Sequence, residues 1–262
     1  MRIDVLGSGS AFSMVRNTSS ILVSDQQLQR WLIDCGPTVP RALWQHNFGI
    51  DEIEVIYFTH IHPDHCAGLP VLLNRWKSFG RQAPLTIYCQ AEHRPILQQL
   101  TALATFPVTE ICFAIEWLDI PERWTWRNWQ LASAATQHEM RNLALRIEVD
   151  DHIVFYSGDG RPTSATIALM QDAEIAFQEC AVATPLAEDA SHGDLQSCMA
   201  LAAQLDLPAL GLYHCYDEAL TALADTIAHQ SNLFLSFDGL QIDLNNEKSI
   251  MEQVQCSGNS NE

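Results

Sequence analysis

The sequence predicts an α/β fold in which two β-sheets pack face to face and helices cover their outer surfaces. The chain has 262 residues, 47% of them apolar, which is enough for a single domain with a large core. Short apolar runs typical of strands outnumber the segments typical of helices, and the two kinds alternate along the chain. Two sheets packed against each other, with helices outside, would bury these strands.

The predicted strands are short runs rich in Val, Ile, Leu and aromatic residues, bounded by Gly, Asn, Asp or Pro. They cover residues 2–6, 20–24, 31–35, 54–58, 85–89, 143–149, 152–157, 174–180, 209–214 and 233–237. The stretch "DDH" (150–152) joins two of the later strands and indicates a hairpin. The predicted helices lie between the strands and cover residues 39–47, 68–79, 92–104, 163–171, 194–205 and 217–230.

We expect one domain over residues 1–244, because no linker or internal repeat divides the chain. The remaining residues, 245–262, contain few apolar side chains after Val254. Such a segment cannot bury enough surface to offset the entropy of ordering it, so we expect a flexible C-terminal tail.

The composition limits the classes of partner. The chain has 14 Lys+Arg against 32 Asp+Glu, a net charge of −18, whereas a large nucleic-acid interface needs clustered basic residues. A small-molecule substrate, anionic if a few arginines face the site, is compatible with this charge. No run approaches the roughly 18 apolar residues of a membrane span. The eight cysteines are scattered without a CxxC pair, which indicates reduced thiols and a cytoplasmic location.

The segment "YFTHIHPDHCAGL" carries four candidate metal ligands directly after an apolar strand: His60, His62, Asp64 and His65. Residues two apart in an extended segment point the same way, so His60 and His62 can present two imidazoles to one point. Pro63 disfavours a helix at His62 and keeps that segment extended. Asp64 and His65 can serve a second point nearby. Imidazole combined with carboxylate suits Zn²⁺, Mn²⁺ or Fe, so we expect a pair of metal ions here.

A pair of metal ions needs more ligands, and the ends of other apolar runs supply His138, Asp159 and His214. Each alone is ambiguous, because an Asp-Gly pair is usually just a turn and a lone His after a strand is often structural. Three such residues at strand ends together favour ligation. His192, in the loop "EDASHGDL", is either a general acid beside the metals or simply a residue before the helix that Asp194 caps.

With these residues in this order, the sequence resembles the metallo-β-lactamase superfamily. The resemblance is carried by "THIHPDH", followed by His138, Asp159 and His214, and extends over residues 1 to about 216. The start, "LGSGSAFS…RNTSSILV…WLIDCG", is similar to the branch that holds ribonuclease Z, the phosphoribosyl cyclic phosphodiesterases and the pyrroloquinoline-quinone biosynthesis B protein. The resemblance implies a four-layer αβ/βα sandwich of two mixed sheets, with the metals at one edge.

The resemblance also implies a role for each candidate. One divalent ion, Zn or Mn with Fe also suitable, would be held by His60, His62 and His138. The other would be held by Asp64, His65 and His214, with Asp159 bridging both. Asp64 and His192 are the expected catalytic residues, and His192 lies where this branch carries a histidine thought to protonate the leaving group. Two such ions about 3.5–4 Å apart can share a hydroxide that attacks phosphorus or a carbonyl carbon.

Two departures narrow the expected activity. Ribonuclease Z carries a long tRNA-gripping arm between the ligands matching His138 and Asp159, whereas this chain has only residues 139–158 there. That spacing is similar to the cyclic phosphodiesterases, although residues 10–30 lack the cysteines of their additional zinc site. We therefore expect a phosphodiesterase acting on a small, cyclic or linear, phosphodiester. The alternatives are a carboxylic ester, lactone or thioester hydrolase at the same metals and a non-catalytic carrier in a biosynthetic pathway. Relatives of ribonuclease Z are often dimers, so a homodimer is also compatible.

Substrate contacts are the least specific part of the prediction. Arg16 lies in the N-terminal loop, and Arg141 and Arg161 each lie two residues after a predicted ligand. Any of them could clamp a phosphate through a bidentate contact, or form an ordinary surface salt bridge. The tryptophans of "EWLDIPERWTWRNW", residues 116–129, could form a substrate wall, but such clusters more often form part of a core.

Overall fold

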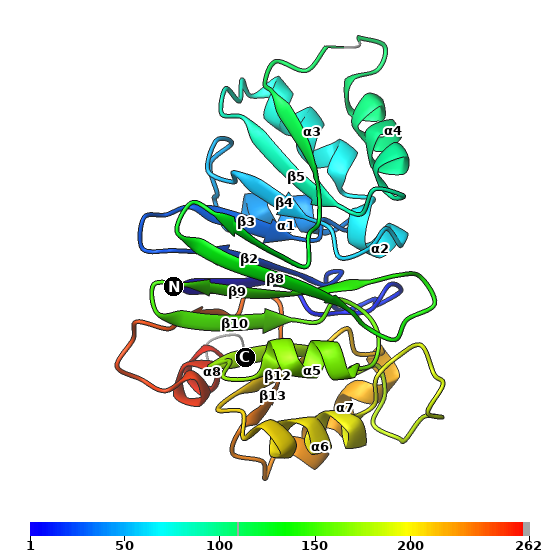
Figure 1. Ribbon diagram of the computed structural model, residues 1–262, viewed down its shortest axis with the longest axis vertical. Helices are drawn as coiled ribbons and strands as arrows, with labels where there is room; N and C mark the ends of the chain where they lie inside the picture. The colour runs from blue at the N-terminus through cyan, green and yellow to red at the C-terminus, as the bar shows by residue number, and fades with distance from the viewer. Residues whose placement is uncertain (109, 259–262) are drawn as a thin grey trace.

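The computed structural model describes residues 1–108 and 110–258, which form two seven-stranded sheets (Figure 1). The first sheet has the strand order β14 (Gln241–Asp243), β1 (Arg2–Gly7), β2 (Ser20–Ser24), β3 (Arg30–Ile33), β4 (Val55–Tyr57), β5 (Leu85–Cys89) and β6 (Ile115–Asp119). The second has the order β13 (Leu233–Leu235), β12 (Leu210–Tyr213), β11 (Ile175–Glu179), β10 (His152–Tyr156), β9 (Leu143–Val149), β8 (Trp129–Ala135) and β7 (Arg123–Trp126). Both sheets are mixed, as predicted: β3 to β6 and β10 to β13 run parallel, and the other neighbours pair antiparallel.

Helices cover the outer face of each sheet, which gives the four predicted layers (Figure 1). The first sheet is covered by α1 (Val39–Gln45), α3 (Leu69–Ser78) and α4 (Arg94–Thr105). The second is covered by α5 (Ser164–Met170), α6 (Leu195–Leu205) and α7 (Leu220–Ile227). The described part of the chain contains no helix that is both long and apolar enough to cross a membrane.

The central core lies between the two sheets, where alternate residues of each strand point inward. Ile3 and Val5 of β1 face the same cluster as Ile147 of β9 and Phe177 of β11. The intervening residues of the strands, such as Leu32 of β3, face the helices instead. This period of two explains why the strands are apolar on both faces, since each face packs against another layer.

The tryptophans of the Trp-rich segment pack in the core and do not line the pocket at the ligand candidates: Trp124, Trp126 and Trp129 lie in or against the cluster between the sheets, and Trp117 packs against the cluster under the helices. Trp129 is fully buried and stacks on Trp31, with ring centroids 5.5 Å apart. Trp126 packs edge-on against both rings, and Trp124 stacks on Tyr57. Trp129 also donates its indole N–H to Asp25 (2.9 Å), which satisfies the polar end of a buried side chain.

Two parts of the chain differ from the sequence prediction. Strands β6, β7 and β14 were not expected, because they lie at sheet edges, where most of their residues are partly or fully exposed and do not form an apolar run. The segment expected to be a flexible tail contains the helix α8 (Ile250–Gly258), while residues 259–262 lie outside the described range. Val254 is buried against the central core, and Gln253 exchanges hydrogen bonds with the backbone of Asp243 in β14. These long-range contacts supply burial that the tail's own composition does not indicate.

The fully buried Arg81 ties the loops beneath β4 and β5 together. Its guanidinium donates to the carbonyl oxygens of residues 50, 53, 83 and 84 at 2.7–2.9 Å, and it lies over the Trp76 ring. Arg81→Met would leave these buried acceptors without donors, so we expect the free energy of unfolding to fall by about 3–5 kcal/mol. Urea denaturation measures this loss. Arg41→Met, at an exposed position on α1, is expected to stay within about 0.5 kcal/mol of the wild type. Equal losses in both variants would contradict the proposed role of the buried network.

Candidate metal centre and catalytic pocket

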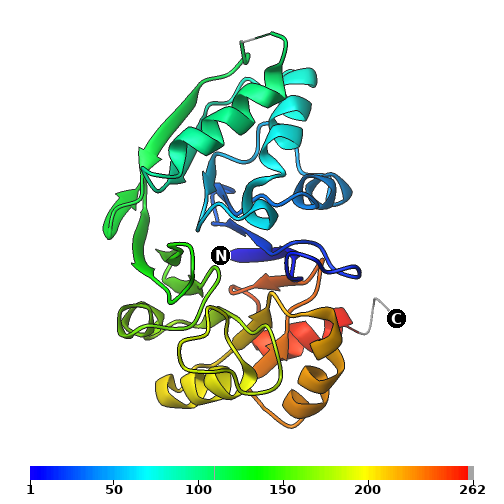
Figure 2. The ribbon, with the colours of Figure 1, turned by 90° about the vertical axis from the view of Figure 1, so that its right-hand side faces the viewer.

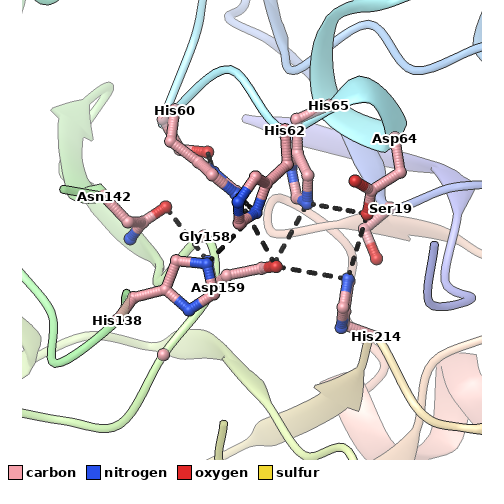
Figure 3. Close-up of polar contacts among 12 residues, drawn as sticks. Ser19, His60, His62, Asp64, His65, His138, Asn142, Gly158, Asp159 and His214 are labelled. Carbon is pink, nitrogen blue, oxygen red and sulfur yellow. Dashed lines mark hydrogen bonds and ion pairs between the residues drawn. The ribbon is translucent and has the colours of Figure 1, made fainter. Parts of the chain in front are cut away.

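The predicted ligands come together where strands of both sheets end, and their side chains point toward one another (Figure 3). Strands β4, β8, β10 and β12 carry their carboxyl ends to this region, and each is followed by a ligand candidate. His60 follows β4, while His138, Asp159 and His214 follow β8, β10 and β12. Four residues therefore come from the loops of the first sheet and three from those of the second.

The turn that carries Asp64 and His65 is fixed against the end of β3. Pro63 starts a short helix that was not predicted, α2 (Pro63–Cys66), and His62 before it is extended, with ψ 147°, as predicted. The backbone N–H of Cys35 donates to the His65 carbonyl at 2.7 Å. A Cβ on Gly36 would lie 1.8 Å from the Asp64 carbonyl oxygen, so only glycine permits this close approach.

The first ligand group consists of His60, His62, His138 and Asp159. His62 Nδ1 lies 3.0 Å from His60 Nε2 and 3.3 Å from His138 Nε2, so three imidazole nitrogens face one point. Burial, together with the neighbouring histidines, holds the pKa of His60 well below its ordinary value. A neutral imidazole is the form that binds a metal ion.

The second ligand group consists of Asp64, His65, Asp159 and His214. Asp159 Oδ1 lies 3.2 Å from His65 Nε2, and its Oδ2 lies 3.3 Å from His214 Nε2. Asp64 Oδ2 lies 3.3 Å from the same two nitrogens. Asp159 is therefore common to both groups and lies between them.

The residues of both groups fit a metal ion. Within each group the ligand atoms all lie within 4.8 Å of one another, and imidazole with carboxylate is the donor set of zinc and manganese sites. His65 Nε2 and Asp159 Oδ1 are buried and face each other at 3.2 Å, but neither makes a hydrogen bond of good geometry to any residue that the structure describes. A cation would satisfy both atoms, because an unpaired buried polar group is otherwise costly.

A carboxylate that was not predicted, Asp34, orients ligands of both groups. It is fully buried and accepts a hydrogen bond from His65 Nδ1 at 2.8 Å. It also accepts from the Thr59 hydroxyl at 2.9 Å, and His60 Nδ1 lies 3.1 Å from that hydroxyl oxygen. These bonds leave Nε2 of each histidine facing the ligand cluster, which is the usual support of a metal-binding histidine.

His192 lies beside the two groups and is held by a second unpredicted carboxylate, Glu179. Its Nδ1 donates to Glu179 Oε1 at 2.5 Å, and the other Glu179 oxygen accepts from the backbone N–H of Gly160. The hydrogen bond to buried Glu179 raises the pKa of His192 to about 9. Nδ1 is therefore engaged, and Nε2 is the nitrogen free to face a substrate in the pocket that His192 lines.

The three arginines predicted to contact substrate do not line this pocket. Arg16 donates to the Ser236 carbonyl at 2.6 Å, and Arg161 donates to Asp194 at 3.0 Å and to the Ser197 hydroxyl at 2.8 Å. Arg141 donates to the Gln90 side chain at 3.0 Å and lies 3.6 Å from Glu92. Asp194 caps α6, as expected, so the guanidinium of Arg161 contacts the residues at the start of that helix.

Asp34 and Glu179 obey the rule that identified the other site residues. Each ends or directly follows an apolar strand whose carboxyl end reaches the site, β3 for Asp34 and β11 for Glu179. An acidic residue at such a position is the signal that would have found them.

Comparison of the sequence with models of known protein families identifies the family of this chain. The family model described as "Anti-Pycsar protein Apyc1" matches residues 1–234. The chain belongs to this family. The ribonuclease Z relatives and the solved metallo-β-lactamase-fold structures that it matches place it in the ribonuclease Z-like branch of the metallo-β-lactamase superfamily, as the sequence predicted.

Individual relatives differ in how much of the chain they match. The Anti-Pycsar protein Apyc1 of Bacillus phage 010DV004 is 38% identical over 89 residues, 33% of this chain and 35% of the phage protein. A ribonuclease Z of Natronomonas pharaonis is 22% identical over 273 residues, covering 82% of this chain and 86% of that protein. The crystal structure of the short form of human tRNase Z matches with a TM-score of 0.78 and 18% identity, covering 93% of this chain and 99% of that one. This last likeness establishes the fold alone.

Proposed function

We propose that this chain is a metal-dependent phosphodiesterase that hydrolyses a small cyclic phosphodiester, with His192 as the general acid. The observation that carries the proposal is the pair of buried His/Asp ligand groups that share Asp159, with His192 on the wall of the adjoining pocket. The name of the Apyc1 relatives points to cyclic nucleotides as the substrate class. We infer two bound ions, Zn²⁺ or Mn²⁺.

In this proposal the two ligand groups hold the ions, which supply Lewis acidity at the phosphoryl oxygens and lower the pKa of water when bound. Asp159 positions the two groups relative to each other through its contacts with His65 and His214. Asp34 and Glu179 hold the imidazoles in the tautomers that the reaction requires. His192 Nε2 carries the proton that goes to the leaving alkoxide, which departs poorly without one.

A small substrate is favoured over tRNA. The segment between His138 and Asp159 is folded as the single hairpin β9–β10, with Asp150 and Asp151 in the left-handed conformation of a tight turn. The net charge of −18 would repel a polyanion over most of the surface. The pocket itself has a volume of about 570 Å³, which is typical of a small-molecule site.

The proposal is tested by loading the protein with Zn²⁺ or Mn²⁺ and measuring hydrolysis of 3′,5′-cyclic mononucleotides, with separation of the linear product. His60→Ala is the matched control, because it removes one ligand of the first group. We expect metal-dependent opening of the cyclic phosphodiester that is lost in the variant. Hydrolysis of a lactone or thioester in place of every cyclic phosphodiester would overturn the choice of substrate class, and metal binding without any turnover would favour a carrier.

A further inference from the structure

One wall of the pocket is a loop whose apolar side chains have no role in the core. Residues 10–14, between β1 and β2, line the same pocket as the ligand candidates His62, Asp64, Asp159 and His214. Phe12 and Met14 are 94% and 93% exposed, the highest fractions among the exposed large apolar residues of the described chain. Figure 2 shows this loop in dark blue, between the halves of the molecule that the two sheets form. Large apolar side chains that cluster at a pocket mark a contact surface.

This loop is held in place beside the site. The Ser13 hydroxyl donates to Asp217 Oδ1 at 2.5 Å, and the Met14 backbone N–H donates to Asp217 Oδ2 at 2.7 Å. Asp217 begins the short helix η1 (Asp217–Ala219), three residues after the ligand candidate His214. Tyr216 lines the same pocket, and its ring centroid lies 6.1 Å from that of His192. These bonds fix the loop that carries Phe12 and Met14 to the segment after His214, in the pocket that His192 also lines.

The charge of the pocket restricts what can lie against this wall. None of the described residues that line the pocket is Lys or Arg. Beyond the ligand candidates, the lining contributes the carboxylates of Glu139, Asp217 and Glu218. Among the side chains that line the pocket, only the histidines can attract negative charge, together with any metal ions that the ligand candidates hold. A single phosphodiester is therefore favoured beside the ligand candidates. The rest of the ligand must be uncharged, because a second phosphate would meet carboxylates alone.

We propose that residues 10–14 form the nucleobase-recognition wall of the site. The substrate is a cyclic mononucleotide whose base lies against Phe12 and Met14 while its cyclic phosphate faces the metal-ligand candidates. This inference rests on the proposed phosphodiesterase function and adds the group that is recognised. A flat, uncharged base with two apolar faces matches an exposed aromatic ring and a thioether, and such contacts tolerate changes of base.

The experiment compares two substrates of the metal-loaded protein: a 3′,5′-cyclic nucleotide and 1-O-methyl ribose 3′,5′-cyclic phosphate, which has no base. We expect Phe12→Ala to lower kcat/KM for the nucleotide by roughly 5- to 150-fold, through KM, and to leave the base-free substrate unchanged. Phe12→Trp keeps an aromatic face and is expected to retain most of the activity. Val15→Ala is the matched control, because Val15 is 70% exposed in the same loop but does not line this pocket.

The outcomes separate this inference from the proposed function. If the wild type opens both substrates and Phe12→Ala weakens neither, or weakens both equally, the nucleobase wall is wrong and the phosphodiesterase stands. If the wild type opens neither substrate, the proposed function itself fails. An equal loss in Val15→Ala would also overturn the inference, because it would mean that the loop's fold matters and not its contact with the base.

Discussion

Asp159→Asn is expected to abolish metal-dependent turnover and to lower the affinity for Zn²⁺ by at least about 100-fold. Even residues that only support a ligand cost 10- to 100-fold when replaced, and Asp159 belongs to both ligand groups. Its two oxygens lie 3.2 Å from His65 Nε2 and 3.3 Å from His214 Nε2. Asp64 also reaches these two nitrogens, but among the described ligand candidates it belongs to the second group alone. Asparagine keeps the shape but removes the charge that offsets two cations. Elemental analysis of the purified protein measures bound metal directly.

The control for this prediction is Asp189→Asn, the same chemical change at an exposed position of the loop after β11. We expect that variant to keep the wild-type metal content and activity. Asp159→Asn protein that still bound two ions per chain at wild-type affinity would remove Asp159 from the ligand set. Loss of metal in both variants would indicate a general effect of charge and not a bridging role.

His192→Ala is expected to slow substrates with an alkoxide leaving group by roughly 10²- to 10⁴-fold, the usual contribution of a general acid. The leaving group of a p-nitrophenyl phosphodiester is a stable phenolate that needs little protonation, so turnover of that substrate should fall far less. The measurement is the ratio of the two kcat values in wild type and variant. A protonating residue changes this ratio, whereas a residue that only shapes the pocket slows both substrates alike.

His152→Ala provides a matched control for this comparison. His152 Nδ1 pairs with Glu174 at 3.0 Å, much as His192 Nδ1 pairs with Glu179 at 2.5 Å, but His152 starts β10 at the opposite edge of the sheet. We expect its removal to leave both rates within about twofold of the wild type, as for substitutions away from the site. Equal losses for both leaving groups in His192→Ala would rule out its role as the general acid.

The fold was largely predictable because its strands are buried on both faces and therefore read as continuous apolar runs. The prediction failed where burial depends on partners far along the chain. Strand β14 pairs with β1, and Val254 of α8 packs on the same core, although neither segment is strongly apolar by itself. At the edges, β6 and β7 mix exposed charged residues with tryptophan and lack a strand's usual pattern.

The site was predictable where several ligand types crowd a short segment or a strand end. His60 and His62 could be paired from local geometry, because both lie in one extended segment. The arginines could not be assigned, since a guanidinium reaches far and its partner is set by tertiary contacts: Arg161 reaches Asp194 at a helix end. Glu179 was overlooked because a buried acidic residue is uncommon. The hydrogen bond that satisfies it comes from His192, in the loop that follows β11, and the sequence alone does not show that contact.

Because the ligand candidates are divided between the two sheets, the proposed ions would also stabilise the packing of one sheet against the other. His60, His62, Asp64 and His65 belong to one half of the sandwich, and His138, Asp159 and His214 to the other. An ion held by ligands from both halves connects them. Because it binds only when both halves are folded together, it stabilises the folded state by RT ln(1 + [M]/Kd), about 2.7 kcal/mol when the metal concentration is one hundred times Kd. The free energy of unfolding of this protein would then depend on the concentration of free metal ion, as its catalysis does.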